Sequence, residues 1–147
     1  MHKIQKEKYM SYFENCLYFS SNQLARHLNK IAEAAFNELN ITPTQGFTLI
    51  VVGELDIHAP TEIAKALEMK PSTITRFLDK LETLQYVERT YTGRSTDVQL
   101  TSMGAHMLPA IQEAWCNIDS TIKEVFTETL SKDLTKKLII ANSIFNA

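Results

Sequence analysis

A proline at position 71 constrains the fold more than any other residue, because it separates two short amphipathic segments. The residue before a proline is biased away from the helical region, whereas proline itself suits the first position of a helix. The pattern therefore predicts one helix that begins at a Thr61 cap and ends before Met69, and a second that runs from Pro71 to about Leu84. In the second helix the apolar residues fall within one arc, and the opposite face gathers Ser72, Thr75, Arg76, Asp79 and Thr83.

A small β-hairpin should follow this pair of helices. Residues alternate in character over Val87–Tyr91 and Asp97–Leu100, on either side of a Thr-Gly-Arg-Ser turn. A two-helix corner followed by a hairpin is the layout of a winged helix-turn-helix, in which the second helix enters the DNA major groove and the hairpin, or wing, reaches the flanking backbone. Small hydroxyl side chains would let that helix sit deep in a groove about 12 Å wide, with Arg76 reaching a base edge or a phosphate. The same face also fits the solvated surface of an ordinary amphipathic helix.

Helices should also flank the corner, which makes the predicted fold mainly α with one small hairpin. Apolar residues at helical spacing predict a long helix from about Met10 to Leu39. The run Thr42-Pro43-Thr44-Gln45 combines a capping box with a proline at the first helical position, and it should start a short apolar helix that ends near Gly53. Two helices should follow the hairpin, with caps at Thr101 and Ser131 and a kink in the first of them caused by Pro109.

The charge of the chain gives only local support for nucleic-acid binding. Its 15 Lys and Arg against 17 Asp and Glu give a formal net charge of −2, whereas a protein that binds a polyanion is expected to carry a basic footprint. Between Lys70 and Ser95, however, five basic residues stand against three acidic ones, a local charge of +2. The positive charge is therefore concentrated on the second corner helix and the hairpin.

Three stretches together resemble the MarR family of dimeric winged-helix transcriptional regulators: ITPTQGFTLI, TEIAKALEMKPSTITRFLDKLETLQYVER and VQLTSMG. The run STITRFLDKLE, followed by a wing arginine and by LTxxG, is the most specific part. The resemblance implies a winged helix-turn-helix lobe over residues 41–101 of a single chain 1–147, with dimerisation helices over residues 8–39 and 102–147. It also implies a homodimer that reads a pseudo-palindromic site on double-stranded DNA, with its recognition helices about 34–36 Å apart.

The resemblance assigns several residues to DNA binding. The recognition-helix positions match Ser72, Thr73, Thr75 and Arg76, and the entry to that helix matches Lys70 and Pro71. The start of the first corner helix matches Thr61, and the wing arginine matches Arg94. Lys80 adds positive charge to the same helix. The chain has Thr92 where the family usually has Asp, and its wing is about two residues shorter. We therefore expect the minor-groove contact of Arg94 to supply less affinity here than in family members with a full wing.

Regulation by a small molecule or by oxidation is a further expectation from the resemblance. Family members commonly bind a small aromatic or anionic effector between the dimer helices and the DNA-binding lobe. The residues that could line such a pocket are Tyr18, Leu24, Phe47 and Trp115, although aromatic side chains at helical spacing also fit a core. One branch of the family senses oxidants through a cysteine of the N-terminal helix, which makes Cys16 a candidate. Cys16 lies about two residues further from the TPTQ run than the cysteine of that branch, which on a helix turns it about 200° away from the matching face. The other interpretation is that Cys16 is a small buried hydrophobic residue.

The remaining patterns exclude other classes of protein. Metal-ligand spacings, nucleophile motifs and glycine-rich phosphate loops are absent from the sequence, so we predict no enzymatic activity, no metal and no cofactor. The apolar runs are too short to span a membrane and the N-terminus lacks an export signal, so we expect a cytoplasmic protein. The sequence thus predicts a homodimeric repressor modulated by a small-molecule effector. The alternatives are thiol-based oxidant sensing through Cys16, and a helical dimer that binds a ligand or a protein without binding DNA.

Overall fold

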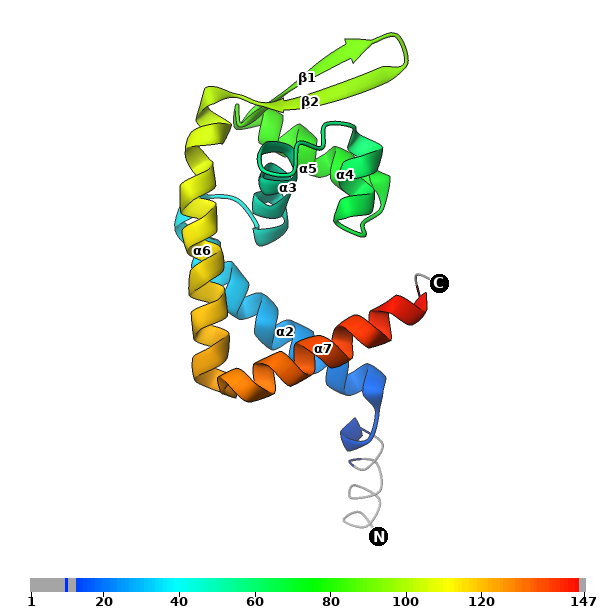
Figure 1. Ribbon diagram of the computed structural model, residues 1–147, viewed down its shortest axis with the longest axis vertical. Coiled ribbons are helices and arrows are strands. Elements are labelled where there is room, and N and C mark those ends of the chain that lie inside the picture. The colour runs from blue at the N-terminus through cyan, green and yellow to red at the C-terminus, as the bar shows by residue number, and fades with distance from the viewer. Residues whose placement is uncertain (1–9, 11–12, 146–147) are drawn as a thin grey trace. The chain divides into compact units, whose positions relative to one another are not determined.

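The computed structural model describes Met10 and residues 13–145, and these form two compact units (Figure 1). The central unit is Ala35–Asn117, and the terminal unit combines the chain up to Ala34 with the chain from Ile118 onward. Two long helices, α2 (Leu17–Phe36) and α6 (Ser102–Phe126), contribute residues to both units. The lobe predicted over residues 41–101 lies inside the central unit.

Helices and one hairpin build the central unit. The end of α2 leads through a short 3-10 helix, η1 (Asn37–Leu39), into α3 (Pro43–Gly53), α4 (Pro60–Ala66) and α5 (Pro71–Thr83). The antiparallel pair β1 (Val87–Thr92) and β2 (Ser95–Leu100) follows, and then the first part of α6. The largest fully buried side chains are those of Phe36, Leu49, Ile63, Ile74, Leu78, Leu81, Val87, Val98 and Ile111. The prediction of a mainly helical chain with a two-stranded wing is confirmed.

The helix starts in the central unit follow local capping rules. The capping box of α3 forms as predicted: the backbone N–H of Thr42 donates to Gln45 Oε1 at 2.9 Å, and the N–H of Gln45 donates to Thr42 Oγ1 at 3.3 Å. Pro71 is the first residue of α5, also as predicted, and Lys70 is its cap. The prediction that Thr61 caps the first corner helix is wrong, because Pro60 occupies the first helical position and Ala59 is the cap. The Thr61 side chain therefore lies exposed in the first turn of α4.

The wing is longer than the sequence pattern indicated. Its strands pair from Val87 opposite Leu100 to Thr92 opposite Ser95, which leaves a two-residue turn of Gly93 and Arg94. Gly93 has a φ of 61°, whereas Arg94 is not among the residues with positive φ. A glycine with positive φ at the first of two turn positions is typical of a type II′ hairpin, whose twist matches that of the strands.

The junction between the wing and α6 is closely packed. Thr101 caps α6 as predicted, since its Oγ1 accepts from the N–H of Gly104 at 3.0 Å. The same hydroxyl donates to the carbonyl oxygen of Gln85 at 2.6 Å, and the Thr101 N–H donates to the carbonyl oxygen of Tyr86 at 3.1 Å. Helix α6 continues through Pro109 to Phe126.

The terminal unit contains Leu17–Ala34 of α2, the end of α6 and α7 (Glu128–Phe145). The continuous helix predicted from Met10 to Leu39 is wrong at both ends: Asn15 and Cys16 are not helical, and η1 replaces the last turn. The backbone carbonyl of Cys16 instead accepts from the N–H of Ser20 at 2.9 Å and starts α2. The cap predicted at Ser131 is also wrong, because α7 starts at Glu128 and Thr127 Oγ1 accepts from the N–H of Leu130 at 3.4 Å.

Candidate nucleic-acid interface

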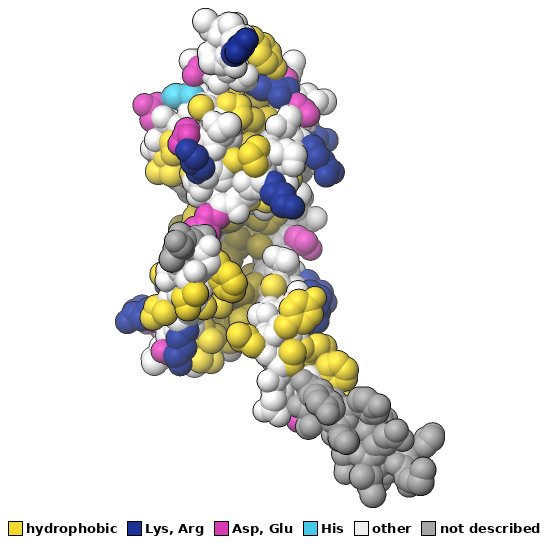
Figure 2. Space-filling view, turned by 90° about the vertical axis from the view of Figure 1, so that its right-hand side faces the viewer, with side chains coloured by type: hydrophobic (Ala, Val, Ile, Leu, Met, Phe, Trp, Pro, Cys, Tyr) yellow, Lys and Arg dark blue, Asp and Glu magenta, His cyan; other side chains and the backbone are white. Residues whose placement is uncertain are grey.

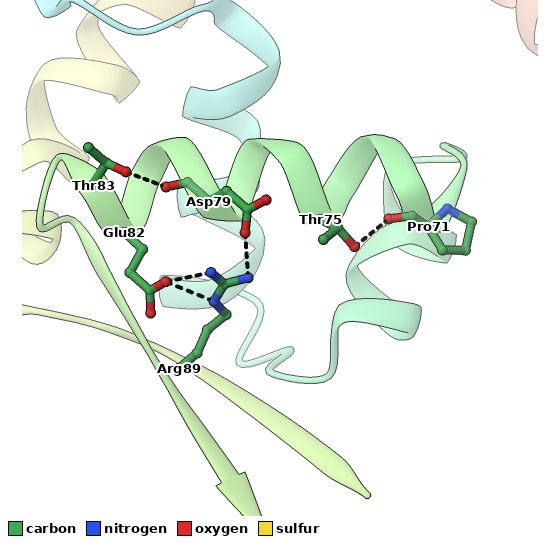
Figure 3. Close-up of polar contacts among 6 residues, drawn as sticks. All are labelled: Pro71, Thr75, Asp79, Glu82, Thr83 and Arg89. Atoms are coloured by element: carbon green, nitrogen blue, oxygen red, sulfur yellow. Dashed lines mark hydrogen bonds and ion pairs between the residues drawn. The ribbon is translucent and has the colours of Figure 1, made fainter.

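Helix α5 presents a polar face with small side chains. Ser72, Thr75 and Arg76 are exposed and Thr73 is half-buried, while Ile74 and Leu78 on the other side are fully buried. The Thr75 hydroxyl donates to the carbonyl oxygen of Pro71 at 3.0 Å (Figure 3), so its oxygen can still accept a hydrogen bond. The amphipathic division predicted for this helix is confirmed, and its outward face combines hydroxyl groups with one arginine.

Four exposed cationic side chains belong to α5, its cap and the wing turn. Lys70, at the cap of α5, Arg76 and Lys80, on α5, and Arg94, in the wing turn, are all exposed. Within residues 13–145, none of the ion pairs engages any of the four. These cations are therefore available to an anionic partner.

The fifth basic residue of the stretch is already neutralised. Arg89, on β1, lies against α5, where its Nη1 is 2.8 Å from Asp79 Oδ1 and its Nε and Nη2 donate to Glu82 Oε2 (Figure 3). The Arg89 side chain is only 14 % exposed. Its hydrogen bonds to Glu82 and Asp79 raise the pKa of Arg89, and the same contact holds the pKa of Glu82 below its ordinary value. Arg89 thus fastens the wing to α5.

This contact changes the local charge balance. Without Arg89, Asp79 and Glu82, the stretch from Lys70 to Ser95 keeps four basic residues and one acidic residue, Glu88. In the sequence alone, Arg89 is indistinguishable from the other cations of the stretch. Because side chains alternate along a strand, Arg89 lies on the same face of β1 as buried Val87. This alternation could have indicated that the Arg89 side chain faces the helix.

A histidine that the sequence interpretation left aside connects the loop before α4 to the wing. His58 Nδ1 lies 2.8 Å from the carbonyl oxygen of Val98, and Nε2 lies 2.8 Å from Asp56 Oδ1. The Val98 N–H also donates to the carbonyl oxygen of His58 at 3.0 Å. The hydrogen bond to Val98 and, next, that to Asp56 raise the pKa of His58.

The four residues suggested for an effector pocket fall into two groups. Phe47 and Trp115 pack together in the central unit with ring centroids 4.6 Å apart, and Phe36 meets Phe47 edge-on at 6.3 Å. Leu24 and Tyr18 belong to the terminal unit. Leu24 lines two cavities there, whereas the Tyr18 side chain is exposed and lines neither.

The larger of these two cavities, about 600 Å³, lies between α2 and the end of α6. Its walls are mainly apolar, with Leu24, Leu28, Ile31, Val125 and Phe126, and its polar residues are Ser20, Gln23, His27 and Lys30. The smaller one, about 160 Å³, extends toward α7. Cys16, at the start of α2, is half-buried and lines neither cavity.

Other kinds of site are not seen in the described part of the chain. Residues 13–145 contain no cluster of three or more His, Cys, Asp or Glu side chains that could hold a metal ion. No helix among the described residues is both long enough and apolar enough to cross a membrane.

Comparison with known proteins agrees with this geometry. A family model described as the MarR family matches residues 41–91, which span α3 to β1. The HTH-type transcriptional regulator BilQ of Clostridioides difficile (strain CD3) is 24 % identical over 142 residues, covering 92 % of this chain and 96 % of BilQ. The MepR–DNA complex of S. aureus superposes with a TM-score of 0.76 at 20 % identity, covering 88 % of this chain and 98 % of MepR. The repressor CouR bound to p-coumaroyl-CoA superposes with a TM-score of 0.81 at 18 % identity, covering 90 % of this chain and 96 % of CouR.

Proposed function

Because the chain belongs to the MarR family of winged helix-turn-helix transcriptional regulators, which are DNA-binding proteins and not enzymes, we propose that it is a sequence-specific repressor. It binds double-stranded DNA as a homodimer, and a small molecule modulates its affinity. The observation that carries this proposal is the set of four exposed cations of α5, its cap and the wing turn, none of which forms an ion pair among the described residues.

Each residue of the set has a distinct role in the proposed complex. Arg76, with Ser72, Thr73 and Thr75, reads base edges in the major groove, because guanidinium and hydroxyl groups match the donors and acceptors displayed there. Lys70 and Lys80 neutralise phosphates, and Thr61 and Pro71 lie at helix starts where the backbone approaches a phosphate. Arg94, at the tip of the wing, enters the flanking minor groove.

The homodimer is supported by the apolar surface of the terminal unit. Helix α7 has no buried residue in the single chain, and Ile139, Ile140, Ile144 and Phe145 are between 63 % and 88 % exposed. Figure 2 shows hydrophobic side chains gathered over this unit. Exposed apolar area of this extent is rare on monomers and is typical of an interface, so a second copy of the chain would cover it. Phe13, Leu17 and Leu138 extend the same exposed set.

The effector is proposed to be a small aromatic or anionic molecule. Similarity to CouR, which was solved with an acyl-CoA, supports this class of ligand. Trp115 is the only tryptophan of the chain and packs on Phe47, so its fluorescence should report binding near the aromatic pair. Titration with p-coumaroyl-CoA and with salicylate should quench this fluorescence and release DNA. Unchanged fluorescence and unchanged DNA affinity with both compounds would remove them as effectors.

Salt dependence tests DNA binding itself. Wild-type protein should bind mixed genomic fragments with an affinity that falls on a log–log plot by about 0.9 per neutralised phosphate. Arg76→Ala should lose selectivity for the preferred site by about 1–3 kcal/mol while remaining a dimer. Arg26→Ala, an exposed arginine of α2, is the matched control and should behave like wild type.

The possible outcomes separate the competing functions. Absence of DNA binding at low salt would favour a helical dimer that binds only a ligand or a protein. Binding with an unchanged footprint in Arg76→Ala would show that α5 is not the recognition helix.

A further inference from the structure

One pair of residues in the wing is held from both sides. Arg89 and Val98 lie opposite each other in the hairpin register. Arg89 is bound to Asp79 and Glu82 of α5, and Val98 is bound through its N–H and its carbonyl oxygen to His58, just before α4. We call Arg89 and Val98 the anchored pair, because it joins the wing to α5 and to the loop before α4.

The His58 side of this attachment depends on a proton. A carbonyl oxygen and a carboxylate can only accept hydrogen bonds, so both ring nitrogens must donate if both contacts of 2.8 Å are to be hydrogen bonds. Only the imidazolium form does this. In the neutral ring, one nitrogen directs a lone pair at an oxygen, and that contact becomes unfavourable. The carboxylates that face the ring are Asp56, in its own loop, and Asp97, on β2, and both favour the protonated form.

The anchored pair lies at the base of a lever that ends at Arg94. Three further residue pairs separate it from the wing turn, a length of about 10 Å at 3.4 Å per residue. A rotation of about 10° at the base would move the tip by about 2 Å, which is enough to break a hydrogen bond to DNA. A fixed base thus holds Arg94 where it can contact DNA while α5 lies in the major groove. Less conformational entropy is then lost when the contact between the wing and DNA forms.

We propose that His58 is a positioning residue for the wing, and that its protonation fastens the wing and strengthens the contact between Arg94 and DNA. This inference rests on the proposed DNA-binding function. Its sign follows from linkage: the contact is fully present below the ordinary value of 6.5 for histidine and is lost as pH rises through the raised pKa of His58. Operator affinity should therefore fall as pH increases from about 6 to about 8.

The test is a double-mutant cycle between His58 and Arg94 at both pH values, with affinity measured by fluorescence anisotropy at constant salt. His58→Asn keeps an N–H donor for the Val98 carbonyl but cannot titrate. We expect wild type to lose about fivefold to tenfold in affinity between pH 6 and pH 8. His58→Asn, Arg94→Ala and the double variant should lose less than about twofold. His106→Asn, which changes an exposed histidine of α6, is the control and should retain the wild-type pH dependence.

A measurement without DNA separates this inference from the proposed function. In the free protein, the NMR titration midpoint of His58 should lie above the ordinary histidine value of 6.5, and Asp56→Asn should lower it. Asp56 suits this change because its side chain is 93 % exposed and asparagine tolerates its φ of 55°. DNA binding whose dependence on Arg94 is the same at pH 6 and pH 8 would overturn the role of His58 alone. No binding to DNA at either pH would overturn the proposed function as well, even if His58 titrates as expected.

Discussion

A methyl group at Gly104 should destabilise the junction between the wing and α6. A β-carbon at this position would lie 1.9 Å from the carbonyl oxygen of Tyr86, whereas carbon and oxygen in ordinary contact stay more than about 3 Å apart. The obstacle is backbone, which cannot move aside as a flexible side chain can. In Gly104→Ala, helix α6 and the Tyr86 carbonyl must separate by about 1 Å, which disturbs the two hydrogen bonds from Thr101 to Gln85 and Tyr86.

The magnitude follows from three contributions. Overpacking costs about 1–3 kcal/mol, and a weakened hydrogen bond costs about 1 kcal/mol more. The better helix propensity of alanine returns about 1 kcal/mol, so the free energy of unfolding should fall by about 1–3 kcal/mol. For a chain of this length, that is a decrease in Tm of about 3–10 °C.

Thermal unfolding followed by circular dichroism measures this change, at one fixed protein concentration because a dimer would make Tm depend on concentration. Ser102→Ala is the matched control, since Ser102 is exposed on the same turn and its replacement adds no atoms. We expect the control to stay within about 0.5 kcal/mol of wild type. A Tm of Gly104→Ala equal to that of the control would refute the close approach of α6 to Tyr86.

Three further predictions concern the ion pair, the interface and the thiol. Glu82→Gln should lower Tm more at pH 7 than at pH 3, because Arg89 holds the pKa of Glu82 below its ordinary 4.5 and the stabilisation is lost as pH falls through that lowered pKa; equal losses at both values would contradict the sign. Ile140→Glu should shift the mass in light scattering from dimer to monomer, whereas Lys136→Gln on the same helix should not. Cys16→Ser should leave DNA release by hydrogen peroxide unchanged, and a peroxide-sensitive wild type beside an insensitive variant would establish the thiol as a sensor.

Local chemistry accounts for the features that could be predicted from the sequence. The cap of α3 depends on two side chains three residues apart, and the start of α5 depends on the fixed φ of one proline. Both are decided within one helical turn. Applied consistently, the proline rule would also have placed Pro60 at the first position of α4 and corrected the role given to Thr61. In the LTxxG pattern, the cap at Thr101 is likewise local. The glycine of the pattern, Gly104, is required because the carbonyl oxygen of the distant Tyr86 leaves no room for a β-carbon.

Features that depend on contacts between distant segments could not be predicted in the same way. The partner of His58 lies 40 residues away, and no spacing within one helix or strand indicates it. The break at Asn15 and Cys16 in the first predicted helix was missed for a different reason: the segment contains no proline or glycine to mark it. The suggested effector residues are large aromatic or aliphatic side chains in predicted helices, but these properties do not determine which unit each residue joins.

The arrangement of ion pairs explains how a chain with a net charge of −2 can present a cationic surface. Asp79 and Glu82 lie on the helix proposed to enter the major groove, where unpaired carboxylates would face phosphates. Arg89 reaches them from β1, so one contact both neutralises two acids and fixes the wing against α5. If this reasoning is right, Arg89→Met should weaken DNA binding more than the loss of one phosphate contact would, because it exposes two unpaired carboxylates and frees the wing together. The loss of affinity should be greatest at low salt, because salt screens the repulsion between the exposed carboxylates and the phosphates.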